Sequence, residues 1–300
     1  MYTRRTFFNI SLLAALSLCT QSFGQTANSV KLSNNNIKLS LKMGMVGFGK
    51  TPDEKFKGIQ ELGYDGMELN SPGGLDKTAS LAASKKYNFP IHGVVDSTHW
   101  RTPLSHPSDE KREQAFQDLI TAINDSYKCG GNAVLIVPAV VKKGTTHQEA
   151  WDRSIEVIKK AIPHAAQKGQ HILIENVWNN FLYDPEGDNN QSAELLKKYI
   201  DEINSPWVGS YFDIGNHQRF GKPAEWIRTL GKRIVKLDVK DWGAENGFCK
   251  LGEGDVDWSE VRKALKEINY SGWATAEVKG GDKARCAEIL KNMRTHLLGE

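Results

Sequence analysis

Five acidic residues, far apart in the chain, each stand at or near the end of a short apolar run: Glu68, Glu175, Asp213, Asp238 and Glu277. Taken alone, each would more often be a solvated acid at the end of a strand. Brought together, several carboxylates would repel one another and raise one another's pKa unless a cation held them. Their oxygens favour a hard cation such as Mg²⁺ or Mn²⁺, whereas a histidine ligand would favour Zn²⁺ or Co²⁺. The acids therefore predict a divalent metal site, provided that the fold brings them together.

The stretch from residue 207 to residue 242 indicates a fold that could do this. Residues 207–213 form an apolar run that ends in Asp213, and residues 234–241 form another that ends in charged groups. Between them, residues 223–230 have a helical pattern that begins with proline. Two strands joined by a helix are parallel neighbours in one sheet. Their carboxyl ends then share the edge at which α/β barrels and open sheets build active sites.

The same alternation of strand and helix runs through most of the chain. We expect strands at 39–46, 66–69, 90–95, 133–137, 171–175, 207–213, 234–241 and 273–277. Helices are expected at 52–62, 75–87, 108–128, 146–167, 192–203, 223–230, 258–268 and 283–297. Eight such units predict a single (β/α)8 TIM barrel over residues 39–300. A doubly wound sheet is the alternative, disfavoured because no glycine-rich fingerprint follows the first strand.

The N-terminus predicts export. Arg4 and Arg5 precede an apolar run at residues 10–18, and small residues follow near position 24. We expect residues 1–24 to be a signal peptide resembling the twin-arginine type, and residues 25–38 to be a polar linker. The apolar run is too short for a permanent membrane anchor. The mature protein is therefore expected in the periplasm, detached from the membrane. The alternative is an N-terminal segment that stays attached.

Charge and cysteine content narrow the classes of partner. The formal charge is +3, and removing Arg4 and Arg5 leaves +1. A near-neutral chain gives no electrostatic reason to expect nucleic acid as a partner.

Cys129, Cys249 and Cys286 would remain after cleavage of the signal peptide. Three cysteines are an odd number and have no paired spacing, so neither a disulfide framework nor a zinc knuckle is expected.

Several segments resemble one known family of barrels. They are Glu-Asn-Val-Trp-Asn-Asn at 175–180, Phe-Asp-Ile-Gly-Asn at 212–216, Leu-Gly-Lys-Arg-Ile at 230–234, Leu-Gly-Glu-Gly-Asp-Val-Asp-Trp at 251–258, residues 273–281, and the pairs His99-Trp100 and Pro103-Leu104. In these segments the chain resembles the sugar phosphate isomerase/epimerase family, the xylose-isomerase-like TIM barrels, over nearly its whole mature length.

The resemblance implies roles for particular residues. Glu175 and Glu277 would be metal ligands and also the acid/base pair, and Asp213 would be a third ligand. The fourth is usually a histidine in a His-x-Lys-Asp-like run, and here Asp238-Val-Lys-Asp stands in that place. This departure leaves the metal open, with Mn²⁺ or Mg²⁺ favoured and Zn²⁺ or Co²⁺ as alternatives. Asn216 stands where some relatives carry a histidine, and His217 comes one residue later.

The implied chemistry is proton transfer next to a carbonyl. A cation that holds a sugar's carbonyl and hydroxyl oxygens stabilises the enediolate formed when a carbon-bound proton leaves. Glu175 and Glu277 would remove and return that proton. Lys240 would stabilise the oxyanion, or else be an ordinary salt-bridge partner. The expected substrate contacts are Glu68, His92, His99, Trp100, Trp178, Asn216, His217 and Trp242; for each histidine and tryptophan, plain packing is the alternative.

The predicted function is therefore a metal-dependent sugar isomerase or epimerase. Export and the lack of a glycine-rich phosphate loop favour a non-phosphorylated sugar or keto-sugar. The closest alternative is a 3-keto-glycoside lyase, which would use the same enolising groups to expel a β-substituent. A non-catalytic carbohydrate-binding protein is another. A metal-dependent abasic-site endonuclease is disfavoured, since it would need more histidines and a basic DNA track. A homo-oligomer is compatible with the sequence.

Overall fold

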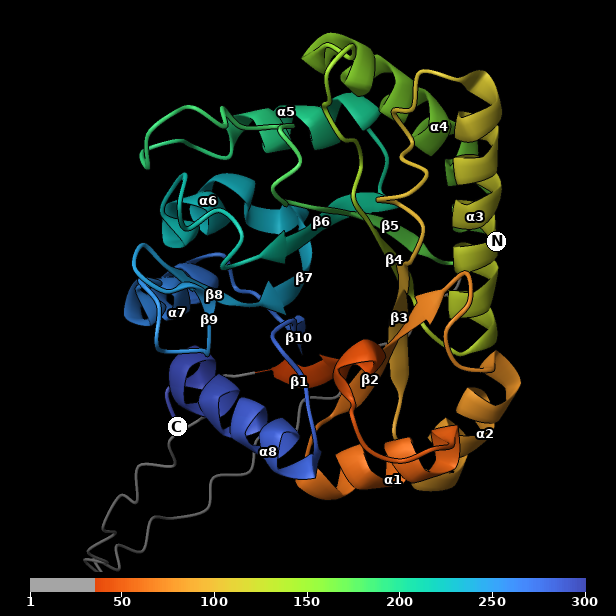
Figure 1. Cartoon of the computed structure of the whole chain (residues 1–300), viewed down its shortest axis with the longest axis vertical. Helices are drawn as coiled ribbons and strands as arrows, with labels where there is room; N and C mark the ends of the chain where they lie inside the picture. Colours follow the sequence, from red (N-terminus) through yellow and green to blue (C-terminus); the bar gives the residue numbers. More distant parts are fainter. Residues whose placement is uncertain (1–35) are drawn as a thin grey trace, which may run out of the picture. The chain divides into compact units, whose positions relative to one another are not determined.

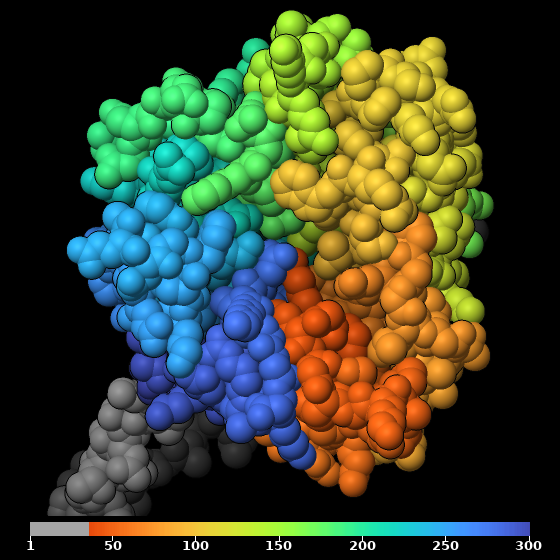
Figure 2. Space-filling view, in the orientation of Figure 1, coloured from red at the N-terminus to blue at the C-terminus, as the bar shows by residue number. Residues whose placement is uncertain are grey.

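A closed ring of eight parallel strands forms the centre of the protein (Figure 1). The computed structural model describes residues 36–300. The strands are β1 (Ile37–Lys42), β2 (Gly66–Ser71), β3 (Ile91–Asp96), β4 (Ala133–Ile136), β5 (His171–Glu175), β6 (Val208–Asp213), β7 (Ile234–Val239) and β10 (Gly272–Ala276). The ring closes where β1 pairs with β10, with Leu39 opposite Ala274. Figure 2 shows the red and blue ends of the described chain meeting on one face, as this pairing requires. The predicted TIM barrel is confirmed, and the doubly wound sheet is excluded because such a sheet stays open.

Eight helices alternate with the strands and surround the ring (Figure 1). They are α1 (Pro52–Leu62), α2 (Lys77–Tyr87), α3 (Asp109–Lys128), α4 (His147–Gln167), α5 (Glu194–Ile203), α6 (Pro223–Leu230), α7 (Trp258–Glu267) and α8 (Lys283–Asn292). Local sequence sets several of their ends. Thr51 caps α1 in a capping box with Glu54, and Gly63 ends it with a φ of 94°. Ser108 occupies the N-cap position of α3, but its side chain makes no capping hydrogen bond.

Strand register places the acidic residues at one rim of the barrel. Asp213 on β6 lies opposite Asp238 on β7, and Asp238 lies opposite Thr275 on β10. Glu175, the last residue of β5, pairs with Tyr211. Because all eight strands run in the same direction, their carboxyl ends meet at this rim.

Several segments differ from the sequence-based expectation: the last helix, expected at 283–297, ends at Asn292 and is followed by a π-helical turn, and the strand expected at 234–241 ends at Val239. The first strand begins at Ile37 and ends at Lys42, after which residues 43–45 form a 3₁₀ turn instead of extending the strand to 46. A short antiparallel hairpin, β8 (Asp241–Gly243) and β9 (Gly247–Cys249), follows β7 and was not predicted. Strands of three residues are too short to show a period-2 pattern.

The predicted signal peptide and most of the predicted linker lie outside the described residues. Within residues 36–300, no helix has both the length and the apolar character needed to cross a bilayer. Cys129, Cys249 and Cys286 are free thiols.

Candidate metal centre

Four of the five acidic residues meet at the rim. Glu175, Asp213, Asp238 and Glu277 each place one carboxylate oxygen within 4.8 Å of those of the others. The first three are buried, and the side chain of Glu277 is 33% exposed. The cluster therefore joins residues separated by about a hundred positions in the chain, as predicted from the strand ends.

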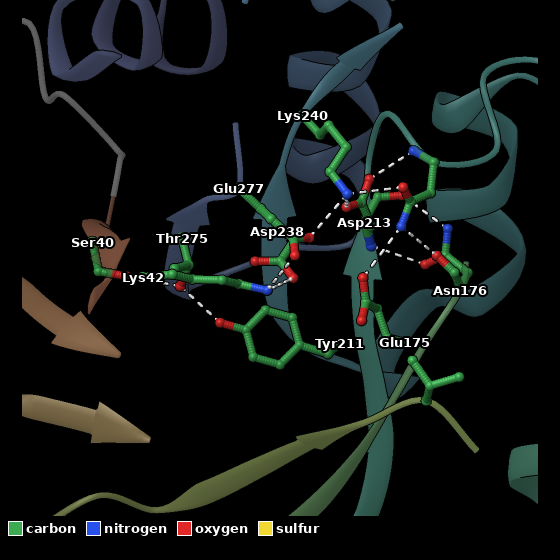
Figure 3. A network of polar contacts seen from close by, with 12 residues as sticks. Ser40, Lys42, Glu175, Asn176, Tyr211, Asp213, Asp238, Lys240, Thr275 and Glu277 are labelled. Carbon is green, nitrogen blue, oxygen red and sulfur yellow. Dashed lines mark hydrogen bonds and ion pairs between the residues drawn. The ribbon is translucent and has the colours of Figure 1, made fainter. Parts of the chain in front are cut away.

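Two lysines lie among these acids (Figure 3). Lys42, at the end of β1, places its Nζ 2.7 Å from Asp238 Oδ2 and 3.2 Å from Glu277 Oε1. Lys240, directly after β7, places its Nζ 3.0 Å from Glu277 Oε2 and 3.2 Å from Asp213 Oδ2. Each oxygen of Glu277 thus faces one ammonium group. The result is a chain of alternating charges that runs from Asp238 to Asp213.

Glu175 and Glu277 differ strongly in their affinity for a proton. Burial and the neighbouring charge of Glu277 raise the pKa of Glu175 to about 8. Burial also works against ionisation of Glu277, but Lys42 and Lys240 outweigh it and lower the pKa of this carboxyl to about 2. A pair of carboxyl groups whose surroundings push their pKa values apart is suited to acid/base chemistry.

The donor set fits a hard divalent cation. When every group is ionised, four carboxylates and two ammonium groups leave a formal charge of −2, which a divalent ion would balance. Asp238 Oδ1 is buried and accepts no hydrogen bond. An ion that binds oxygen at about 2.1 Å holds opposite ligands about 4.2 Å apart, which is close to the spread of these oxygens. The residues present are therefore consistent with a divalent metal site.

A turn after β6 holds the acids in place. The amides of Gly215 and Asn216 donate to Asp213 Oδ1 at 2.8 and 2.7 Å. The Asn216 side chain donates to Glu175 Oε1 at 3.2 Å and accepts from Lys240 at 2.9 Å. Asn176 fixes the Asp213 backbone through two hydrogen bonds, one donated and one accepted. Asn216 thus links the Glu175 carboxylate to the Lys240 ammonium group inside the site.

Four predicted substrate contacts lie at the mouth of the barrel, in the hairpin or in the loops after β3 and β5. The rings of Trp178 and Trp242 are 6.3 Å apart, and Trp178 is 36% exposed. Trp100 is 46% exposed and lies edge-on to His99. His99 is buried and accepts a hydrogen bond from the Val137 amide. Burial and the charge of nearby Lys42 lower the pKa of His99 to about 3, so the ring is neutral.

Two predicted histidines do not face the acid cluster. His92 lies inside the barrel, where Nε2 is 2.8 Å from Ser40 Oγ and Nδ1 is 3.0 Å from Lys236 Nζ. The Nε2 of His217 is 3.1 Å from the Val177 carbonyl, and its ring packs against Trp226. These contacts fit the packing role that the sequence left open for every histidine, and a role of either ring in substrate binding stays a prediction.

Glu68 lies at the rim but outside the four-acid cluster. In the register of β2 with β1 it lies opposite Lys42, and its side chain is buried.

Sequence reasoning missed Lys42, although it ends the first strand at the same level as the acids. It also missed Phe248 on the hairpin, which lines a cavity of about 670 Å³ beside Lys240 and Glu277.

Comparisons with known proteins also indicate a TIM barrel. The sequence profile of the xylose isomerase-like TIM barrel family matches residues 56–296. An uncharacterized protein of Methanocaldococcus jannaschii is 27% identical over 238 residues, which cover 77% of this chain and 78% of that protein. L-ribulose-5-phosphate 3-epimerase of Escherichia coli is 24% identical over 260 residues, covering 79% and 88%. The crystal structure of D-allulose 3-epimerase from Methylomonas sp. has a TM-score of 0.70 at 18% identity and covers 87% of this chain and 97% of that one, which shows the shared fold.

Proposed function

Because the chain belongs to the xylose isomerase-like TIM barrel family, we propose that it is a metal-dependent sugar 3-epimerase. The observation that carries the proposal is the carboxylate cluster at the rim of the barrel, in which oxygens of Glu175, Asp213, Asp238 and Glu277 lie within 4.8 Å of one another. The names of two similar proteins, both 3-epimerases of ketose sugars or their phosphates, support the choice of reaction.

An epimerisation needs one carboxyl group on each side of the reacting carbon. Glu175 ends β5 and Glu277 follows β10, and β6 and β7 separate these strands on the ring. The two side chains therefore approach the cluster from different directions (Figure 3). One glutamate takes the proton from C3, the electron pair moves into the C2 carbonyl to give an enediolate, and the other returns a proton to the opposite face. In the reverse direction their roles exchange.

The four acids would hold a divalent cation, which supplies the Lewis acid that polarises the ketose carbonyl. Glu175 and Glu277 would therefore serve both as ligands of the ion and as the acid/base pair. Lys240 lies between Glu277 and Asp213 and lines the adjoining cavity. Its ammonium group is placed to stabilise negative charge that develops on a substrate oxygen.

The mouth of the barrel supports a sugar as substrate. Trp178 and Phe248 have ring centroids 5.0 Å apart, and both rings are partly exposed. Such rings can cover the apolar face of a sugar while the acids bind its oxygens. The predicted export signal supports a non-phosphorylated sugar, and Mn²⁺ or Mg²⁺ is the ion that an all-oxygen donor set favours.

The test is isotope exchange in deuterated water. Protein loaded with Mn²⁺ is incubated with D-allulose, L-ribulose, L-ribulose 5-phosphate and a 3-keto-glucoside, and products are followed by NMR and mass spectrometry. The proposal expects an epimer that carries one deuterium at C3 from a non-phosphorylated ketose. Release of the aglycone would instead indicate the lyase, and binding without any exchange would indicate a carbohydrate-binding protein.

Two matched variants separate chemistry from folding. Glu175→Gln and Glu277→Gln keep the shape of each side chain but remove its proton transfer, so exchange should fall by at least about a thousandfold in both. Glu61→Gln, an exposed change on α1, serves as the control and should leave exchange unchanged.

A further inference from the structure

Lys42 occupies an unusual position for a lysine. Its side chain is 9% exposed, and its Nζ contacts Asp238 at 2.7 Å and Glu277 at 3.2 Å. These are two of the four carboxylates of the candidate metal centre. An ammonium group at this point neutralises the same oxygens that a cation would bind. Lys42 and a divalent ion therefore compete for the same negative charge.

A third carboxylate, that of Glu68, belongs to the strand next to Lys42. Glu68 on β2 pairs directly with Lys42 on β1, so their backbones are separated only by the spacing of neighbouring strands. Glu68 is 1% exposed, and its oxygens accept no hydrogen bond of normal geometry, although the Tyr211 hydroxyl and the ammonium groups of Lys42 and Lys236 lie near it. A buried carboxyl group that lacks a full set of hydrogen bonds is costly, and it offers an acceptor within reach of a flexible lysine.

We propose that Lys42 is an internal counter-ion that exchanges with the divalent metal. Without metal, its ammonium group holds Asp238 and Glu277 together. When a metal enters, Lys42 moves from these two carboxylates to Glu68. Without metal, Lys42 offsets part of the negative charge of the four-acid cluster, and with metal it offsets the charge of Glu68 instead. The need to displace Lys42 limits the affinity for metal.

The proposal rests on the metal centre of the proposed function but not on any activity toward sugars. Its test therefore measures Mn²⁺ binding directly, by titration calorimetry and by the EPR signal of free Mn²⁺. The variants are Lys42→Met, Glu68→Gln and the double variant. Lys38→Met is the matched control, because Lys38 is an exposed lysine on the same strand that lies over the Trp273 ring.

Removing the competing charge should tighten binding. We expect Lys42→Met to bind Mn²⁺ about tenfold or more tightly than the wild type, and Lys38→Met to bind like the wild type. Glu68→Gln should weaken binding several-fold, because the displaced ammonium group loses its acceptor. In the Lys42→Met background the same Glu68→Gln change should have much less effect, since no ammonium group remains to be moved.

Thermal unfolding gives a second readout. Metal-free Lys42→Met should melt below the wild type, because Asp238 loses its partner, and Mn²⁺ should raise its Tm by more than it raises that of the wild type. If Lys42→Met does not fold without metal, the same comparison of Tm with and without Mn²⁺ is made with Lys42→Gln and Glu68→Gln.

The inference is overturned if Lys42→Met binds Mn²⁺ no more tightly than the wild type. It is also overturned if Glu68→Gln weakens binding equally with and without Lys42. If neither the wild type nor any variant binds Mn²⁺, the metal centre of the proposed function fails as well. If Lys42→Met binds Mn²⁺ more tightly as expected but no sugar is turned over, the inference stands and only the proposed reaction is contradicted.

Discussion

Asp241 anchors the hairpin that covers one side of the mouth, and replacing it should loosen that hairpin. The side chain is fully buried. Its Oδ2 accepts hydrogen bonds from the Gly252 amide at 2.8 Å and from Trp258 Nε1 at 3.0 Å. Its Oδ1 accepts from the Trp242 amide at 2.9 Å. Asp241→Asn keeps the shape of the side chain but turns one acceptor into a donor, so two N–H groups lose their partner.

The expected cost follows from those bonds. A hydrogen bond to a charged acceptor contributes about 1.5–3 kcal/mol, so losing the pair at Oδ2 should lower the free energy of unfolding by about 3–6 kcal/mol. In a barrel of this size the smaller figure corresponds to a fall in Tm of roughly 6–12 °C. The hairpin carries Trp242 and Phe248. The KM for the sugar should therefore rise more than kcat falls.

The assay is urea unfolding followed by circular dichroism, with steady-state kinetics on the same samples. Asp255→Asn is the matched control, because this exposed neighbour accepts one side-chain hydrogen bond, from the Ala244 amide at 2.7 Å. It should cost less than about 1 kcal/mol. If Asp241→Asn were as stable as the control, the assignment of Asp241 as the anchor of the hairpin would be wrong.

Three further variants test other parts of the structure. Burial raises the pKa of Asp96 to about 6 despite its hydrogen bonds with Thr98, so the folded state prefers the protonated acid. The contribution of Asp96 is therefore present below pH 4 and is lost as pH rises toward 6, by about 3 kcal/mol, and urea unfolding of Asp96→Asn between pH 4 and 7 should lack that decline. A methyl group at Gly215 would lie 2.6 Å from the Lys240 carbonyl carbon and oxygen, so Gly215→Ala should destabilise the protein by about 1–3 kcal/mol and weaken Mn²⁺ binding in calorimetry. Trp178→Ala removes an exposed ring at the mouth and should raise KM with little change in kcat, and an unchanged KM would argue against stacking on the sugar.

The acidic residues could be predicted as a set because their position depends on strand direction alone. Parallel strands share an edge for their carboxyl ends, so an apolar run that ends in Glu175 or Asp213 already indicates which rim the carboxylate reaches. Side-chain direction is a finer property. Asn216 and His217 are neighbours in the chain, yet the side chain of Asn216 contacts Glu175 while that of His217 packs against Trp226.

Lys42 could not be found in the same way. A lysine after an apolar run usually indicates a solvated strand end. Its contact with Asp238 exists only because β1 closes the barrel against β10, which in turn pairs with β7. That contact joins positions 196 residues apart, and no local pattern records it. The hairpin was missed for a local reason, because its strands are too short to show any period.

The most direct test of the central claim is the number of Mn²⁺ ions bound per chain, measured by EPR in the wild type and in Asp213→Asn. Asp213 is fully buried at the end of β6, and the carboxylates of three other strand ends or loops surround it. If these four acids together bind one divalent ion, the wild type should bind one Mn²⁺ and the variant should bind it at least about a hundredfold more weakly. A wild type that binds no Mn²⁺, or a variant that holds the ion as tightly, would contradict the metal centre.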